Sequence, residues 1–152
     1  MNDQTIPEEG AQTLATACAQ AMWADDRASQ GLGMELVEVA PGRAVLEMTV
    51  TPAMTNGHGM CHGGFIFTLA DSAFAFACNT YNQRTVALHC AITFIAPVSK
   101  GDRLRATARE VSRRGRSGIY DIAVSLADGT VVAEFRGQSR TIKGTLLDGE
   151  GQ

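Results

Sequence analysis

The stretch that decides the fold runs from Asn56 to Asn79 and reads NGHGMCHGGFIFTLADSAFAFACN. Only three residues of its core, 65–78, are polar: Thr68, Asp71 and Ser72. A helix that is apolar on all sides is buried inside a protein. Residues 63–79 would rise only ~25 Å as a helix, and a carboxylate lies in the middle, so a membrane-spanning helix is not expected. We therefore predict a long helix at the centre of a soluble domain.

The entry to this helix is rich in glycine. The sequence His62-Gly63-Gly64 removes side-chain bulk where the first backbone N–H groups of a helix have no intrahelical partner. Donors and the positive end of the helix dipole therefore stay open to a small, electron-rich ligand. His62 itself either orients a substrate or caps the loop, or it only bonds to backbone in the Gly-rich turn.

One face of the predicted helix carries small and polar residues at spacings of three and four: Gly64, Thr68, Asp71, Ser72, Ala75 and Asn79. Asp71 lies at the centre of this stripe. A buried carboxylate is costly unless it is paired or has a function. Asp71 is therefore either a general base or nucleophile in a groove of low dielectric constant, or a carboxylate bonded to a neighbouring hydroxyl or backbone group.

Length and composition are those of one globular domain. The chain has 152 residues, of which 45% are hydrophobic, and we expect a single domain over 1–152 with loose tails at 1–10 and 144–152. The first residues have neither a basic region nor an apolar run, so no signal peptide is expected. The four cysteines lie in apolar segments without close pairing, which indicates reduced thiols and a cytoplasmic protein. A net charge of −3 argues against general nucleic-acid binding.

The segments around the central helix predict one further helix and six strands. An Ala-rich amphipathic helix is expected over 11–27. The strands are expected at 36–40, 44–50, 87–94, 104–109, 119–127 and 131–142, with a type II turn at Pro41-Gly42 and a tight hairpin at Asp128-Gly129. Short connections favour an antiparallel sheet, and a sheet that covers an all-apolar helix has to curl around it.

The histidines and cysteines suggest two other kinds of site, a metal site and a cysteine nucleophile, but each lacks part of the sequence pattern that such a site needs. His58, Cys61 and His62, with the more distant His89 and Cys90, could hold a metal, although their spacing matches no strong zinc pattern. Cys61 could act as a nucleophile beside His62, yet no third residue is placed to orient the pair. A packed thiol is the simpler interpretation of Cys61.

A basic turn follows the fourth strand. Arg113, Arg114 and Arg116 are flanked by glycines and by Ser117. Guanidinium groups match the oxygen atoms of phosphates, so this turn suits an exposed diphosphate or sugar phosphate. The alternative is an ordinary solvated hairpin, because exposed basic turns are common.

The motifs of the loop and helix, together with those of the later strands, resemble one known family. They are Asn56-Gly57-His58, Cys61-His62-Gly63-Gly64, Leu69-Ala70-Asp71, Ala73-Phe74-Ala75, Pro97, Gly101-Asp102 and Gly118-Ile119-Tyr120-Asp121. From about Gly31 to Thr145 the chain resembles the phenylacetic-acid-degradation (PaaI-type) acyl-CoA thioesterases of the hotdog fold. The resemblance implies an α+β fold in which an antiparallel six-stranded sheet curls around a long buried helix, with an additional N-terminal helix.

The same resemblance implies a reaction, a site and an assembly. Acyl-CoA thioesters, favoured as phenylacetyl or hydroxyphenylacetyl groups, would be hydrolysed to free acid and coenzyme A. The backbone N–H of Gly63 would polarise the thioester carbonyl, and Asp71 would attack directly or activate water. The residues lining the reacting centre would be Asn56, His62 and Ser72, and those contacting coenzyme A would be Arg113, Arg114, Arg116, Ser117 and Gly118. No metal and no cofactor are implied, and a homodimer that often pairs into a homotetramer is expected.

Helix geometry adds that the site is shared between two chains. Gly63 and Asp71 are eight residues apart, or ~12 Å along a helix axis, so one thioester carbon cannot contact both. A two-fold axis that sets two such helices side by side and antiparallel would bring Gly63 of one chain toward Asp71 of the other.

Two functions from other classes remain open. One is a hotdog protein that binds acyl-CoA as a sensor without catalysis, although binding alone does not need a buried carboxylate. The other is a hydratase or dehydratase on the same fold, which would use a His and acid pair at the acyl chain. Release of free thiol from acyl-CoA separates all three.

Overall fold

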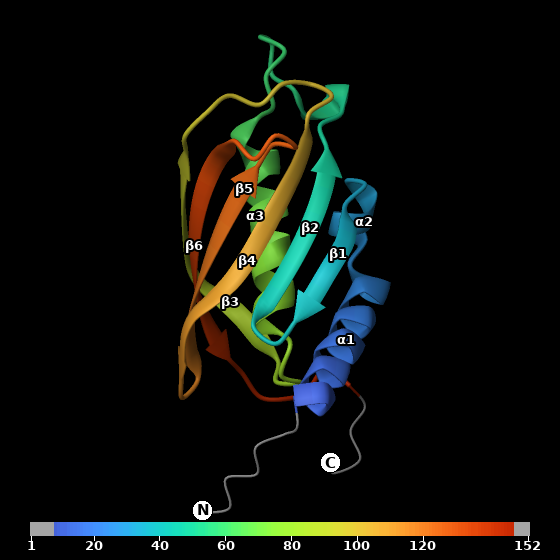
Figure 1. Ribbon diagram of the computed structural model, residues 1–152, viewed down its shortest axis with the longest axis vertical. Coiled ribbons are helices and arrows are strands. Elements are labelled where there is room, and N and C mark those ends of the chain that lie inside the picture. Colours follow the sequence, from blue (N-terminus) through green and yellow to red (C-terminus); the bar gives the residue numbers. More distant parts are fainter. Residues whose placement is uncertain (1–7, 148–152) are drawn as a thin grey trace, which may run out of the picture.

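The computed structural model describes residues 8–147 and consists of one curled sheet around one long helix (Figure 1). The strands are β1 (Glu35–Ala40), β2 (Arg43–Thr49), β3 (Thr85–Phe94), β4 (Arg103–Arg114), β5 (Ser117–Ser125) and β6 (Val131–Thr141). They are joined in the order β1-β2-β4-β5-β6-β3 with every pair antiparallel. The helices are α1 (Glu8–Asp25), α2 (Arg27–Gly31) and α3 (Gly63–Cys78), with the 3-10 turn η1 (Pro52–Met54). This is the predicted hotdog arrangement.

Helix α3 is buried because the sheet covers one of its sides and α1 packs against another. It contacts β2, β4 and β5 most extensively. The ring of Phe74 packs directly on Gly137 of β6, where a Cβ atom would lie 2.7 Å from the ring. On the side of α1, the rings of Trp23 and Phe76 are 6.1 Å apart. These two layers cover the apolar residues of α3 that are buried, whereas Thr68, Asp71 and Ser72 stay partly exposed.

Both predicted tight turns are present. Gly42 has a φ of +70°, as the third position of a type II turn requires, and its N–H donates to the Thr80 hydroxyl over 2.8 Å. Gly129 has a φ of +92°, and the carboxylate of Asp128 accepts the N–H of Thr130 at 2.9 Å. These turns set the register of the flanking strands.

The single helix predicted over 11–27 is instead two helices. Helix α1 begins three residues earlier and ends at Asp25, and α2 follows after Asp26. The Asp26 carboxylate accepts the N–H of Ser29 at 3.0 Å and the hydroxyl of Ser29 at 2.7 Å. A side chain that caps a new helix in this way interrupts the preceding one, because it bonds to backbone that would otherwise continue the helix.

The break predicted at 113–118 is much shorter than expected. Strands β4 and β5 stay paired as far as Arg114 and Ser117, so only Gly115 and Arg116 form the turn. A bulge at Val111 keeps the two strands in register on either side of it. Continued ladder bonds satisfy the backbone of the basic segment, and the hairpin is therefore held firmly at its base.

The loose tails predicted at 1–10 and 144–152 need correction where the structure describes them. Residues 8–10 form the first turn of α1. Arg84 makes two backbone hydrogen bonds with the segment after β6. Its carbonyl accepts the N–H of Ile142 at 2.7 Å, and its N–H donates to the carbonyl of Gly144 at 3.0 Å. The Asn82 side-chain oxygen then accepts the N–H groups of Leu146 and Leu147. The remaining tail residues lie outside the described range.

Strand β3 lies at the edge of the sheet, and its apolar residues are not all covered. A bulge at Leu88 interrupts the predicted alternation and leaves that side chain 61% exposed. Val86 and Phe94 are 43% and 50% exposed. An unpaired ten-residue edge with exposed apolar side chains is unusual in a protein that stays monomeric.

Candidate active site

The loop that enters α3 is shaped by Asn56. Its side-chain oxygen accepts the N–H of His58 at 2.9 Å and that of Met60 at 3.2 Å. Its own N–H donates to the Met60 carbonyl, and Thr55 and Cys61 form an isolated bridge across the loop. Within this chain, Asn56 therefore organises the approach to the helix, which explains why an amide is suited to this position.

His62 caps α3 and leaves the next N–H free. Its Nδ1 atom accepts the N–H of Gly64 at 3.0 Å, so the capping interpretation of this histidine is the one found. Within residues 8–147, no acceptor is bonded to the N–H of Gly63. This N–H is the first of the helix and carries part of the positive end of the dipole, as an oxyanion donor requires.

Gly63 packs closely against Phe94, and an apolar groove begins there. A Cβ atom on Gly63 would lie 2.8 Å from the ring of Phe94, which packs over the helix start. Both residues line an open groove of about 490 Å³. Its other lining residues are Met60, Cys61, Ile66, Ile95, Ala96, Pro97 and Val98. The free N–H therefore lies beside a mainly apolar surface of the size that small-molecule sites have.

Asp71 is half-buried on α3 and makes no side-chain hydrogen bond within the described residues. Desolvation raises the pKa of its carboxyl group above the ordinary value. Burial also raises the pKa of the Cys90 thiol, and the nearby Asp71 carboxylate raises it further. Because Cys90 lies on β3, Asp71 is on the side of the helix that faces the open edge of the sheet. Among the residues that the structure describes, the alternative of an Asp bonded to a neighbouring hydroxyl is not found.

Ser72 is bonded to α2. Its hydroxyl shares a 2.8 Å hydrogen bond with the hydroxyl of Ser29. Since Ser29 donates its own proton to Asp26, Ser72 is the donor to Ser29. In this chain Ser72 therefore connects α3 to α2, while its oxygen keeps acceptor capacity for another group.

The basic hairpin lies beyond the C-terminal end of α3. Arg114, Arg116 and Ser117 are exposed, and Arg113 stacks on Tyr81 with its guanidinium carbon 3.5 Å from the ring centre. Gly118 is buried, and there is no room for a side chain at this position, since a Cβ atom would lie 2.6 Å from the Ser139 hydroxyl. Gly118 thus shapes the base of the hairpin and has no side chain to offer a ligand.

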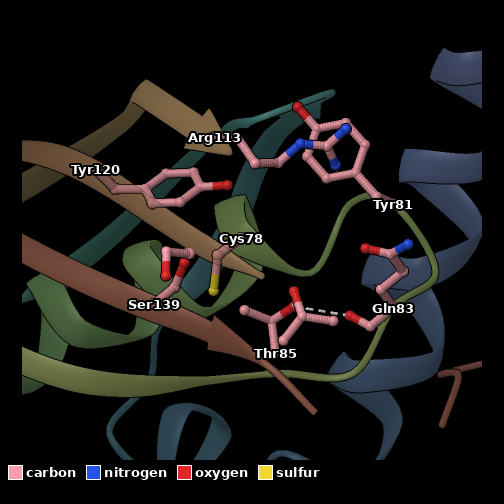
Figure 2. Close-up of a pocket in the computed structure, with 9 residues that line it drawn as sticks. Cys78, Tyr81, Gln83, Thr85, Arg113, Tyr120 and Ser139 are labelled. Carbon is pink, nitrogen blue, oxygen red and sulfur yellow. Dashed lines mark hydrogen bonds between the residues drawn. The ribbon is translucent and has the colours of Figure 1, made fainter. Parts of the chain in front are cut away.

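Sequence reasoning missed a polar cluster beside this hairpin. Glu110 accepts hydrogen bonds from the hydroxyls of Tyr81 and Tyr120, each at 2.9 Å (Figure 2 shows both tyrosines). Together with Arg113 these residues come from the loop after α3, from β4 and from β5. No spacing in the chain relates them, so the sequence held no signal for the cluster.

Neither the metal hypothesis nor the cysteine nucleophile gains support from the side-chain positions. Among residues 8–147, no three His, Cys, Asp or Glu side chains gather closely enough to hold a metal ion. Cys61 is buried, and burial raises the pKa of its thiol. The Nδ1 atom of His62 is occupied by Gly64. In the part of the chain that is described, no helix is long and apolar enough to cross a membrane.

The fold and the residues of this site belong to a known class of protein. A family model described as the thioesterase superfamily matches residues 58–133, which include part of the loop, α3, β3, β4, β5 and the start of β6. The chain therefore belongs to the thioesterase superfamily. The predicted class of enzyme, a thioesterase, and the predicted resemblance to PaaI-type members are confirmed by the relatives described next.

Acyl-coenzyme A thioesterase PaaI of Escherichia coli K12 is 44% identical over 128 residues, which cover 84% of this chain and 91% of the relative. The solved structure of the E. coli PaaI protein from the phenylacetic acid degradation operon matches with a TM-score of 0.87 at 42% identity, covering 89% of this chain and 98% of that chain. A mutant of phenylacetic acid degradation protein PaaI from Thermus thermophilus matches with a TM-score of 0.74 at 38% identity, covering 77% and 100%.

Proposed function

We propose that this protein hydrolyses acyl-CoA thioesters to free acid and coenzyme A, at a site where the Gly63 N–H of one chain works with Asp71 of a second copy. The observation that carries the proposal is a pair of unoccupied groups on one helix. Within the described residues the Gly63 N–H has no acceptor. Desolvation, and no hydrogen bond to the carboxylate, is what raises the pKa of Asp71. Together they supply the oxyanion donor and the base or nucleophile that thioester hydrolysis needs.

The chemistry proceeds through a tetrahedral intermediate. In the general-base route, Asp71 takes a proton from water as the water oxygen bonds to the thioester carbon. The negative charge then develops on the carbonyl oxygen, where the Gly63 N–H at the helix start stabilises it. The C–S bond breaks as the carbonyl reforms, and the departing sulfur takes the proton from Asp71. In the nucleophilic route, a carboxylate oxygen of Asp71 bonds to the carbon, the C–S bond breaks and coenzyme A leaves as a thiolate. Water then hydrolyses the mixed anhydride to the free acid and the Asp71 carboxylate, and the proton that this step releases goes to the thiolate.

A second copy is required because of the distance along α3. Gly63 and Asp71 are ~12 Å apart along the helix axis, so they serve different sites. Asp71 faces the side of β3, whose edge is unpaired and carries exposed Val86 and Leu88. Pairing of β3 with its copy about a two-fold axis would cover this edge, extend the sheet and set the two α3 helices antiparallel. The homodimer, and its pairing into a homotetramer, remain part of the proposal.

The remaining residues of the site take supporting roles. Asn56 and His62 hold the loop and the helix start so that the Gly63 N–H points outward, and Ser72 keeps an acceptor beside Asp71. We assign contact with the phosphates of coenzyme A to Arg114 and Arg116, with Arg113 and Ser117, and their exposure on the hairpin supports this role. Gly118 contributes only close packing.

The acyl group that we propose is phenylacetyl or hydroxyphenylacetyl. Two of the relatives are described as proteins of phenylacetic acid degradation. The groove beside Gly63 is lined mainly by apolar side chains and includes the exposed ring of Phe94, which suits an aromatic group. We place the reaction in the cytoplasm, because all four cysteines are free thiols and reduced thiols persist there.

A thiol reagent tests this function directly. The purified protein is incubated with phenylacetyl-CoA, hydroxyphenylacetyl-CoA and a series of aliphatic acyl-CoA thioesters, and free thiol is followed over time. Thiol release with the highest kcat/KM for the aromatic thioesters is expected. Binding of acyl-CoA without thiol release would indicate a sensor, and a change in the acyl chain without thiol release would indicate a hydratase. A preference for aliphatic groups would refute the proposed substrate class while keeping the reaction.

A further inference from the structure

The cluster of Glu110, Tyr81 and Tyr120 has no part in the proposed bond-breaking step. Both tyrosine hydroxyls donate to the same oxygen of Glu110, each over 2.9 Å. A Cβ atom on Gly42 would lie 3.0 Å from both the Glu110 Cβ and the Tyr81 hydroxyl, so the β1–β2 turn closes over the cluster. The neighbouring Thr80 hydroxyl accepts the Gly42 N–H. Tyr81 is therefore fixed at its hydroxyl, and the residue before it is bonded to the β1–β2 turn.

The hydroxyls remain protonated at neutral pH. Burial, together with the bond to Glu110 and the charge of that carboxylate, raises the pKa of Tyr81 to about 12. Burial and the Glu110 carboxylate raise the pKa of Tyr120 as well. Both tyrosines therefore stay hydrogen-bond donors to Glu110 over the whole physiological range, and the cluster is a permanent brace.

The face of the Tyr81 ring carries the Arg113 guanidinium, whose carbon lies 3.5 Å from the ring centre (Figure 2). A guanidinium that stacks by its face keeps the N–H groups of its edge free for planar acceptors. Within residues 8–147, no carboxylate lies within ion-pair distance of Arg113. The stack thus removes the rotational freedom of a long side chain without occupying its donors.

The cavity under this stack is too small to be the binding place itself. It has a volume of about 10 Å³ and is lined by Tyr81, Arg113 and Tyr120 together with Cys78, Gln83, Thr85, Ser117, Ser139 and Thr141. That is room for one water molecule and not for a phosphate group. A phosphate therefore has to meet the outer edge of Arg113, on the solvent side of the hairpin.

We propose that Tyr81, braced by Glu110, is a positioning residue that presents Arg113 to a phosphate of coenzyme A. This inference rests on the proposed function, since it takes coenzyme A as the carrier of the substrate. A preoriented guanidinium loses less conformational entropy when it binds a phosphate than a free one does, so the brace lowers the KM of the CoA thioester and leaves kcat unchanged.

The test compares two thioesters with the same acyl group. Phenylacetyl-CoA carries the phosphates, and phenylacetyl-pantetheine does not. Tyr81→Leu, which removes the stack, is expected to raise KM for the CoA thioester by about threefold to tenfold, the range of an exposed or partly covered cation–π contact. KM for the pantetheine thioester and kcat for both substrates should not change. Tyr81→Phe keeps the ring and loses only the bond to Glu110, so its effect should be smaller.

Two arginine variants complete the design. Arg113→Lys keeps the charge but has no planar face to stack, and it should raise KM for the CoA thioester in the same way as Tyr81→Leu. Because Arg113 is exposed on the hairpin, Arg113→Lys should fold, and it tests the role of the stack even where Tyr81→Leu fails to fold. The combination of Tyr81→Leu with Arg113→Ala should be no worse than Arg113→Ala alone. Arg109→Ala, on the same strand but paired with Asp121, is the matched control and should behave as wild type.

Several outcomes would overturn the inference. They are an equal rise of KM for both thioesters, additive effects of the Tyr81 and Arg113 variants, or a wild-type KM in Arg113→Lys. Direct titration with coenzyme A separates this inference from the hydrolase proposal, because binding is measured without turnover. Weaker binding of coenzyme A by Tyr81→Leu, in a protein that releases no thiol, would support the brace and refute hydrolysis. Wild-type binding of coenzyme A by Arg113→Ala would refute the brace even where hydrolysis is normal.

Discussion

A mixture of two inactive variants should recover activity, since each site is proposed to take Gly63 from one chain and Asp71 from the other. Gly63→Pro removes the free N–H at the first helical position, where proline is tolerated. Its ring would meet Phe94, but that side chain is half-exposed and can turn away. Asp71→Asn keeps the shape of the side chain and removes its charge. Each variant alone should lose at least ~100-fold in hydrolysis.

The magnitude follows from the geometry of α3. The ~12 Å between Gly63 and Asp71 means that the two lesions of a heterodimer fall in one site and leave the other intact. Equal amounts refolded together give heterodimers in about half of the dimers, and half of their sites are intact. The mixture should therefore show about a quarter of wild-type activity.

A second mixture serves as the matched control. Wild type is refolded with the double variant Gly63→Pro/Asp71→Asn in equal amounts. With shared sites, each of the two sites in a heterodimer carries one substitution, so only the wild-type homodimers are active. The mixture should then show about a quarter of wild-type activity. With a complete site in each chain, every wild-type chain works and activity is about half.

Thiol release is measured after co-refolding, and two affinity tags on the two variants show how much heterodimer has formed. An inactive first mixture with heterodimer present would refute the shared site. Half of wild-type activity in the second mixture would refute it independently. Recovery without refolding, by simple mixing, would show that the subunits exchange and leave the interpretation unchanged.

Four further results are expected. Because desolvation raises the pKa of Asp71, hydrolysis by its ionised form should fall as pH falls through that raised pKa. Because the folded state disfavours the ionised Asp71, Asp71→Asn should raise Tm at pH 7. This difference in Tm should disappear below pH ~4, the ordinary pKa of an aspartate, where the carboxyl group is protonated in both the folded and the unfolded state. An unchanged Tm at pH 7 would contradict the burial of a charge. Arg114→Ala/Arg116→Ala should raise KM for acyl-CoA and make KM less sensitive to salt, with kcat nearly constant. An unchanged KM would mean that the turn is only a solvated hairpin without a role in binding. Gly137→Ala should lower the free energy of unfolding in urea by about 1–3 kcal/mol, because the buried Phe74 ring cannot move aside; wild-type stability would contradict that packing.

Local patterns in the sequence determined the elements of this fold. The apolar run after His62 predicted α3, because a helix whose polar residues form only a thin stripe has to be covered over most of its surface. Pro41-Gly42 and Asp128-Gly129 predicted their turns, since their backbone angles suit few other residues. The free N–H of Gly63 also followed locally, because the first donors of any helix lack partners inside it.

Only the tertiary structure decided which side chains meet. Phe94 packs on Gly63 and Glu110 joins two tyrosines through contacts between segments that are far apart in the chain, and no local periodicity encodes such pairs. The position of β3 at the open edge depends on the sheet order, which places it beside the last strand instead of the strands that precede or follow it. Long-range pairing is set by the packing of the whole core, so the face of Asp71 and the support of Arg113 became visible only in three dimensions.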